Sequence, residues 1–534
     1  MESCGFAVRW GPGLLATLAS AASLAAPTWA VDPTEPGPDR GASGYSSFEQ
    51  VLDGEFPFPF EALLRRIEQR LGCVPTSCTT AVLIPFGRSL QRTVAAPDFL
   101  ASPRVVVAVT GAGTGPAYAK DRLYLGYQPR GELLEVISYN DDAGRFEFQL
   151  LRDYRAGARP RLVMAERDVC LACHQNHAPI FPRPLWQETN ANPRLAAAML
   201  EARDGKERVE GVSIARGVDL PNAIDEATDR ANLYSVTRRI WREACDATCR
   251  AAAVHAALEY GRSGGRRFDP VPGLAERFAE RWPDGLAVPN PDLPNRDPLA
   301  EPLSSPVHVP GAFEAMQPRP ALEVWRGGDE WLERRFVRGI AAFLADVDLA
   351  AVATEPERAR QRLLDQDWDN APLSRAGLRA AIGLAADSEC CRPPGAVADP
   401  AVSRTGSEAV PSRAAGFVTH CARCHATTER TPPNFLAGDA QRVESSLVSC
   451  APRIYVRLAM WQKTAAARVK VPMPPPRAAR QGREIAQEAA DPGIDALRRT
   501  VAKWLREETG REPDLESLLA RGYEDLRPCL PAGT

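Results

Sequence analysis

The chain contains Cys170-Leu171-Ala172-Cys173-His174 and, much later, Cys421-Ala422-Arg423-Cys424-His425. We refer to these as the first and second motif; each has two cysteines separated by two residues and followed directly by a histidine. Their first cysteines lie 421 − 170 = 251 positions apart in a chain of 534 residues. With 13 Cys and 6 His in the chain, two chance copies have odds of about 10⁻⁵, so the repeat indicates shared chemistry.

The pattern CxxCH is what covalent attachment of haem requires. Two cysteine thiols add to the vinyl groups of the haem, and the histidine that follows supplies one axial ligand of the iron. We therefore predict two covalent haem c groups, one on Cys170 and Cys173 with His174 as ligand, the other on Cys421 and Cys424 with His425. A four-thiolate zinc site or a thioredoxin-type redox pair is the alternative, but neither explains a histidine after each pair.

The first thirty residues are typical of a secretory signal. Arg9 precedes a small-residue apolar stretch from Gly13 to Ala26, and a polar, proline-rich sequence follows Ala30. We expect a signal peptide at residues 1–30 and a periplasmic protein, which fits both haem attachment and disulfides. The apolar stretch is short for a membrane anchor and no later segment has the length to cross a bilayer, so no stable membrane span is expected.

The composition is that of an ordinary globular protein. The hydrophobic share is 44%, the charged share 25% and the net charge −3, without the basic excess that nucleic-acid binding needs. The length favours several domains, and we predict a multidomain α+β fold. It comprises a small β-rich N-terminal domain (49–169), a helical middle region with the first motif (170–390), a linker (391–413) and an all-α C-terminal domain (414–534).

Periodicity predicts the elements within these regions. An amphipathic helix is expected at Phe60–Leu71, and short apolar or alternating runs predict strands at Ala81–Ile84, Arg104–Val109, Arg122–Tyr127, Leu133–Tyr139 and Arg145–Leu151. Helices are expected at Arg194–Asp204, Ala223–Tyr260, Trp331–Val352 and Glu355–Asp365. The loop at 283–320 holds ten prolines, which predicts that it forms no regular structure.

Eight cysteines outside the signal and the motifs remain for disulfides. Cys73 and Cys78 are expected to close a small loop, whereas Cys245 and Cys249 lie in a predicted helix where a bridge is awkward. Cys450 and Cys529 are expected to reach Cys390 or Cys391.

Residues 414–534 resemble the class I cytochrome c family over their whole length. Gly416–His425 is similar to its N-terminal helix and haem motif, Thr431–Gly438 to the loop that follows, and Ile494–Glu507 to its closing helix. The resemblance implies that the carbonyl of Pro432 or Pro433 orients His425. It also implies that Met473, in Val471-Pro472-Met473-Pro474-Pro475, is the sixth iron ligand, with Met460 as the alternative.

The first motif lacks these surroundings, so its sixth ligand stays open. His308, in a proline-rich stretch that could fold over the haem, is the main candidate. His177, His255 and Met199 are weaker ones, and an iron with no protein ligand on this side is a further possibility. His420, next to Cys421, is expected to be a surface or haem-edge residue.

These features predict a dihaem protein that passes single electrons to and from a redox partner protein or a small electron donor or acceptor. On this hypothesis the chain is not an enzyme. The alternative is a dihaem enzyme similar to cytochrome c peroxidases or oxygenases, with an open first haem and a proton-handling residue such as Gln187 or Glu188 beside it. A binding or sensory module that uses haem structurally is a third hypothesis. The ligand state of the first haem separates these possibilities.

Overall fold

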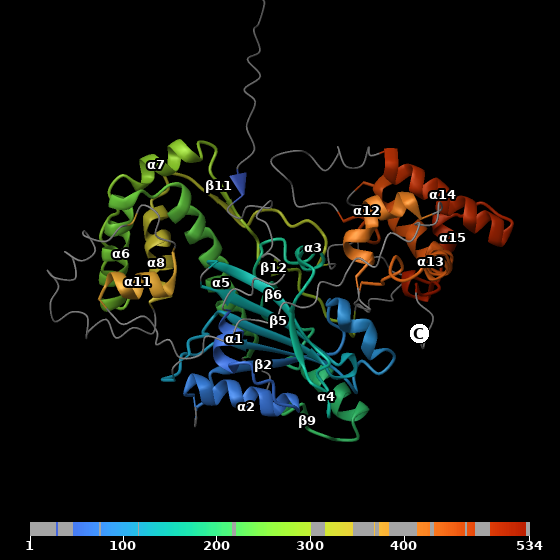
Figure 1. The fold of residues 1–534 in the computed structure, drawn as a ribbon, viewed down its shortest axis with the longest axis horizontal. Coiled ribbons are helices and arrows are strands. Elements are labelled where there is room, and N and C mark those ends of the chain that lie inside the picture. The colour runs from blue at the N-terminus through green and yellow to red at the C-terminus, as the bar shows by residue number, and fades with distance from the viewer. Residues whose placement is uncertain are drawn as a thin grey trace, which may run out of the picture.

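The structure is a computed structural model that describes residues 28–29, 46–300, 315–344, 368, 373–383 and 414–529. Within these ranges, residues 74–75, 116, 142, 216–219, 428–431, 465–466 and 476–491 are not described. The described residues form a mixed α+β structure in which a six-stranded sheet lies between a group of helices on one side and a C-terminal helical unit on the other (Figure 1).

The sheet is an antiparallel meander with the strand order β2-β3-β4-β5-β6-β7. Its strands are β2 (Thr79–Ile84), β3 (Arg104–Val109), β4 (Leu123–Gln128), β5 (Leu133–Asn140), β6 (Arg145–Arg152) and β7 (Arg161–Met164). The five predicted strands are confirmed within two residues at each end. Strand β7 was not predicted, because four residues are too few to show a clear alternation.

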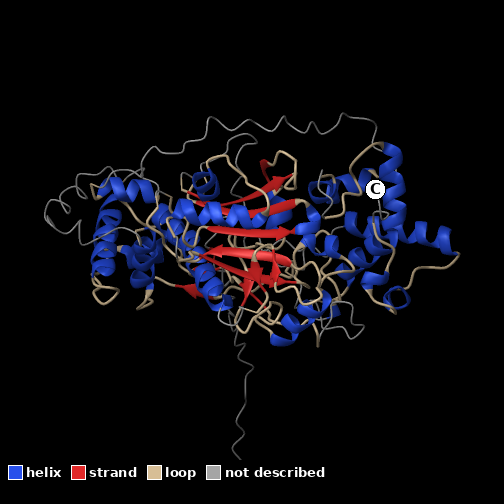
Figure 2. Ribbon diagram, turned by 90° about the horizontal axis from the view of Figure 1, so that it is seen from below, coloured by secondary structure: helices blue, strands red, loops and turns tan. Residues whose placement is uncertain are grey.

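Both faces of the sheet are covered. Successive side chains along a strand point to opposite faces, so a strand that is apolar on both faces must be covered on both sides. Val105, Leu125 and Leu134 belong to a core shared with α1 (Ser47–Leu52), α2 (Phe60–Leu71) and α4 (Pro193–Ala202). On the opposite face, Val106 and Tyr124 belong to a core shared with α5 (Leu220–Glu243). That core continues into α6 (Ala247–Arg262), α7 (Leu274–Arg281), α8 (Leu332–Phe343) and α11 (Arg375–Ala381), and Figure 2 shows the strands between the helical layers.

The prediction of one continuous helix at Ala223–Tyr260 is wrong. The chain forms α5 and α6 instead, and Asp246 begins the second helix by accepting a hydrogen bond from the backbone N–H of Cys249. Because Cys245 lies in the break between the helices, it forms a disulfide with Cys249, with a Cα–Cα distance of 5.2 Å. The expectation that a bridge would be awkward there is therefore also wrong.

Of the other disulfides in the described residues, one confirms a prediction and one corrects a prediction. Cys73 and Cys78 are bonded, as predicted. Cys450 is bonded to Cys529, so neither of them pairs with Cys390 or Cys391. Cys390 and Cys391 lie outside the described residues.

The proline-rich loop contains more structure than predicted. Strand β11 (Leu286–Val288) pairs with β13 (Glu323–Trp325) and with β1 (Thr28–Trp29), and β12 (Asp292–Leu293) pairs with β8 (Phe181–Pro182). Strands of two or three residues fit between the prolines, so proline spacing limited their length without excluding them. The predicted helix Glu355–Asp365, the linker 391–413, His308 and all of the predicted signal peptide except Thr28 and Trp29 lie outside the described residues.

Residues 414–529 form a helical unit with its own core. It consists of α12 (Ala415–His425), α13 (Ala440–Ala459), α14 (Pro492–Thr509) and α15 (Leu515–Leu519), and Phe417, Leu447 and Val501 are buried between them. Helix α14 contains the predicted Ile494–Glu507 helix. No helix in the described part of the chain combines the length and hydropathy needed to cross a membrane.

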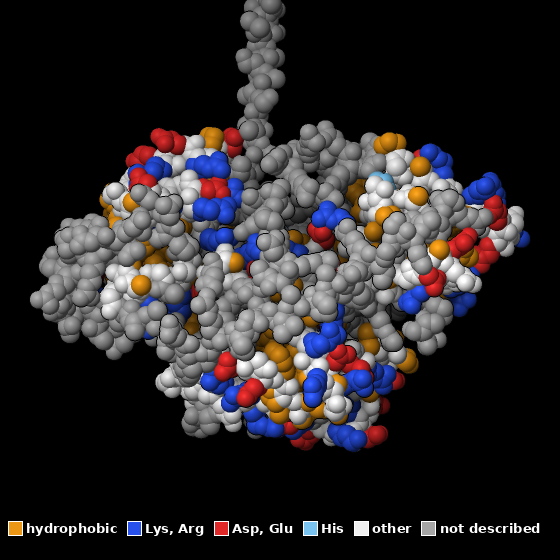
Figure 3. Space-filling view, in the orientation of Figure 1, with side chains coloured by type: hydrophobic (Ala, Val, Ile, Leu, Met, Phe, Trp, Pro, Cys, Tyr) orange, Lys and Arg blue, Asp and Glu red, His pale blue; other side chains and the backbone are white. Residues whose placement is uncertain are grey.

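The remaining short elements connect these layers. They are α3 (Arg167–Leu171), β9 (Arg208–Val209), β10 (Val212–Ser213) and the 3₁₀ turns η1 (Leu90–Ala95), η2 (Pro129–Gly131), η4 (Met460–Gln462) and η7 (Tyr523–Asp525). On the face shown in Figure 3, basic and acidic side chains are interspersed over the described surface.

Candidate haem-binding sites

The first motif lies directly after the last strand of the sheet, on α3 and the turn that follows it. The imidazole Nδ1 of His174 is 2.9 Å from the carbonyl oxygen of Ala178. Because a carbonyl only accepts, Nδ1 carries the proton and the Nε2 lone pair is left for a metal. Burial lowers the pKa of His174 to about 4, helped by the charges of Arg319 and Arg104. The ring is therefore neutral at pH 7, as an iron ligand must be.

The second motif forms the end of α12, and its histidine has the same arrangement. The Nδ1 of His425 is 2.7 Å from the carbonyl oxygen of Pro433, which confirms that one of the two predicted prolines orients this ring. Burial lowers the pKa of His425 to about 4, and the charge of Arg457 adds to the effect. The ring also stacks on Phe435, with centroids 4.3 Å apart.

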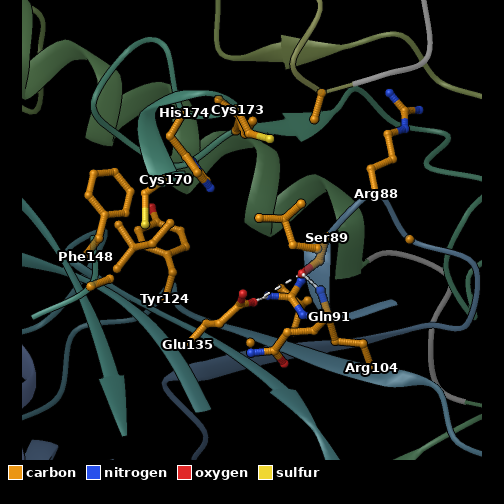
Figure 4. A pocket seen from close by; sticks show the side chains of 18 of the residues that line it. Arg88, Ser89, Gln91, Arg104, Tyr124, Glu135, Phe148, Cys170, Cys173 and His174 are labelled. Carbon is orange, nitrogen blue, oxygen red and sulfur yellow. Dashed lines mark hydrogen bonds and ion pairs between the residues drawn. The ribbon is translucent and has the colours of Figure 1, made fainter. Parts of the chain in front are cut away.

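A cavity separates the first motif from the sheet. Cys170, Cys173 and His174 lie on one side of it and strand residues on the other (Figure 4). Its walls are largely apolar, with contributions from Val106, Tyr124, Ile137, Phe148, Val169, Ile180, Phe181, Trp186 and Leu293. It holds about 210 Å³, below the roughly 300–1,000 Å³ of most ligand pockets, but it is partly open, so a macrocycle would extend beyond it.

The donor set and the charges of this cavity fit haem c. The two thiols and the neutral imidazole are those that covalent haem needs, and the apolar walls suit the macrocycle. Arg88 and Glu188 also line the cavity, and Glu188 forms ion pairs with Arg88 and Arg296. Two guanidinium groups and one carboxylate give this buried cluster a net charge of +1, which suits the anionic propionates of a haem.

The sheet side of the cavity carries polar residues that sequence analysis missed. Figure 4 shows Gln91, Arg104 and Glu135 across the cavity from the first motif, and Arg104 forms an ion pair with Glu135. A signal was present: Arg104 begins, and Glu135 lies within, a strand that is otherwise largely apolar. Their meeting depends on the strand register, which the sequence alone did not give.

None of the predicted sixth ligands of the first haem that lie in the described residues lines this cavity. Among the described lining residues, His174 is the one histidine, and no methionine is present. The Nδ1 of His177 is 3.1 Å from Nη2 of Arg167, and Met199 is buried in the core on the other face of the sheet. His255 lies on α6, which packs against α8. Of the two predicted proton-handling residues, Glu188 lines the cavity and Gln187 does not.

The segment after residue 314 packs onto the first motif. Ala315 lines the cavity, the guanidinium of Arg319 donates to the carbonyl of Cys173 at 2.9 Å, and Gln175 donates to the carbonyl of Gln317 at 3.2 Å. His308 lies outside the described residues, so its role as a ligand stays a prediction.

The two motifs lie side by side despite their separation in the sequence. Helices α3 and α12 are in contact, and the carboxylate of Asp168 is 2.6 Å from the guanidinium of Arg423 (Figure 1). Thr427 and Pro432, which follow the second motif, line the edge of the first cavity. The described residues nevertheless contain no group of three or more His, Cys, Asp or Glu placed to hold one metal ion.

The loop of Met473 is attached to the end of α13. Its backbone N–H donates to the carbonyl of Arg457 at 3.2 Å, and its carbonyl accepts from the indole of Trp461 at 3.2 Å. The charge of Arg457 also contributes to the lowered pKa of His425. Met460, the alternative ligand, is fully buried and packs with Val456 and Leu519.

Comparisons of this chain with protein-family profiles, curated proteins and solved structures find no match.

Proposed function

We propose that the chain is a periplasmic dihaem c-type cytochrome whose two covalently attached haems exchange single electrons. Cys170 and Cys173 would hold one haem with His174 as ligand, and the second motif would hold the other with His425. Bound haem supplies a reversible one-electron change at its iron, with a potential set by axial ligands and burial. The contact between α3 and α12 supports this proposal most directly.

That contact matters because each haem would be bonded to its own helix. Helices that touch keep the two attachment points close, and the ion pair between Asp168 and Arg423 adds a polar link across the contact. Both histidines are neutral and held by backbone carbonyls. The polypeptide thus provides fixed ligands and a fixed separation, which rapid exchange between two redox centres requires.

At the second site, Met473 is the proposed sixth ligand. A thioether sulfur favours ferrous iron and raises the potential, which suits an electron carrier. A redox partner protein or a small electron donor or acceptor would then exchange electrons with the chain. The three disulfides among the described residues, together with the sequence of residues 1–30, support a location outside the reducing cytoplasm.

Haem analysis of the secreted full-length chain tests this proposal. We expect two covalent haems in the wild type and one in each of the variants C170A/C173A and C421A/C424A. The variant C73A/C78A removes a cysteine pair with no histidine after it and should keep both haems. After rapid mixing with less than one equivalent of reductant, electrons should redistribute between the two haems until the one of higher potential is preferentially reduced. A chain without covalent haem, or two haems between which no electron moves, would overturn the proposal.

A dihaem enzyme similar to peroxidases or oxygenases, with an open first haem, is the second candidate. It is favoured by the polar residues across from His174 and by the lack of a second histidine or a methionine among the described lining residues. Optical and EPR spectra of the oxidised protein separate the two candidates. Two low-spin haems indifferent to cyanide and peroxide support a pure carrier, whereas a reactive high-spin haem supports the enzyme.

A further inference from the structure

We propose that Arg319 holds the first motif in place and that its positive charge raises the reduction potential of the haem attached there. The inference rests on the proposed function, since it needs a haem on Cys170 and Cys173. It goes beyond that function, because it assigns to one side chain both the fixing of the motif and the setting of one of the two potentials.

Arg319 connects three segments of the chain through their backbone carbonyls. Its guanidinium donates to the carbonyl of Cys173 at 2.9 Å, to that of Asn290 at 3.1 Å and to that of Ala315 at 3.0 Å. Cys173 belongs to the first motif, Asn290 lies just before β12, and Ala315 lines the cavity. One planar group with several donors therefore fixes the motif against two segments that come much later in the chain.

Gln175 provides a second link between the same segments. Its side-chain amide donates to the carbonyls of Met316 and Gln317 at 3.3 Å and 3.2 Å. The amide oxygen of Gln175 also accepts from the backbone N–H of Arg319 at 3.2 Å. Because the backbone of Arg319 is itself bonded to the motif, the position of the guanidinium does not depend on a flexible side chain alone.

No neighbouring carboxylate cancels the charge of Arg319. Among the described residues none forms an ion pair with it, and the three carbonyls that it contacts are neutral. Asp292, whose charge acts on Arg319, is itself paired with Arg183 at 2.9 Å. The thiol of Cys173 supplies no negative charge once it has become a thioether to haem. The first motif therefore lies beside a cation that keeps its full charge.

This charge acts on the histidine of the motif. Desolvation lowers the pKa of Arg319 to about 10, so the group stays protonated at pH 7. Burial has the largest effect on the pKa of His174, and the charge of Arg319 lowers it further. Arg104 acts in the same direction but is paired with Glu135. A cation that disfavours a protonated imidazole also disfavours a ferric iron on that imidazole, because reduction removes one positive charge.

Redox titration of the haem-loaded full-length chain, resolved for the two haems, tests the inference. In R319Q the equilibrium constant for reduction of the first haem should fall at least about threefold, or about 28 mV for one electron, because glutamine keeps a donor but no charge. The second haem should keep its potential. R250Q is the matched control: Arg250 also donates to backbone carbonyls, those of Trp241 and Trp368, but lies on α6, which lines no part of the cavity. It should change neither potential.

Two further variants test the sign and the origin of the effect, and they keep the inference testable should R319Q not fold. D292N removes a carboxylate charge that acts on Arg319, so the potential of the first haem should rise rather than fall. R319K keeps the charge but replaces the planar group with a single nitrogen. At about pH 6, where a partly buried lysine is protonated, R319K should keep most of the potential that R319Q loses.

Several results would overturn this inference while the proposed function stands. An unchanged first potential in R319Q would do so, as would a lower one in D292N. Equal falls in R319K and R319Q would assign the effect to lost hydrogen bonds rather than to charge. Equal shifts of both haems in R319Q would show a change of the whole structure. A chain with no covalent haem, or without electron exchange between its haems, would instead remove the proposed function itself.

Discussion

The first and second motifs share the same five-residue pattern and the same hydrogen bond from the histidine to a backbone carbonyl, but their surroundings differ. The first lies against a β-sheet that presents Arg104 and Glu135, with Gln91 of η1 beside them. The second lies in a helical unit whose Met473 loop is fastened to α13. The comparison suggests that the motif determines the attachment and the proximal ligand, whereas the surrounding fold determines what the opposite face of each haem meets.

This difference assigns separate roles to the two sites under the proposed function. A site closed by a thioether suits transfer of electrons, and a site with polar side chains across from the histidine would suit a small ligand. Electrons would then pass between the two haems across the α3–α12 contact.

Replacement of Met473 should have the largest effect. In M473A we expect the potential of the second haem to fall by an amount on the order of 0.1 V, since loss of the thioether removes its preference for ferrous iron. Redox titration of the two haems measures this, and the first haem should keep its potential. M460L tests the alternative ligand with a swap that preserves volume: it should leave the potential unchanged, and a fall in M460L instead of M473A would make Met460 the ligand. Equal potentials in M473A and the wild type would exclude Met473 as ligand.

Gly126→Ala should affect the first site alone. The added methyl group displaces the guanidinium of Arg104, the end of a flexible side chain, so we expect the free energy of unfolding to change by no more than about 1 kcal/mol. If the first haem is open, as the second candidate function requires, carbon monoxide should bind its reduced iron, and the separation of Arg104 from Glu135 should shift the C–O stretching frequency. G131A is the matched control, because a Cβ there has ordinary contacts of 3.9 Å. An unchanged frequency in G126A would show that the pair does not face the ligand.

Local signals explain what the sequence predicted well. The two motifs, the strand bounds and the proline carbonyl beside His425 depend on residues close together in the chain. The break before Asp246 was missed because its capping side chain was read as part of one continuous helix, and the Cys245–Cys249 bridge was missed with it. Arg104, Gly126 and Glu135 were not recognised as a group, since their meeting requires the register of three strands.

Local sequence signals also could not predict the contact between the motifs. Substitution in the ion pair across this contact should have the smallest effect of the proposed changes. Asp168 and Arg423 are 48% and 58% exposed, so their pairing should contribute only about 0.2–1 kcal/mol. We expect D168R to slow electron exchange between the haems a few-fold at low salt, because two arginines then repel across the contact. The double variant D168R/R423D restores opposite charges and should recover the rate, and high salt should reduce the differences. Slow exchange in both variants, without recovery, would show that the pair does not position the two motifs.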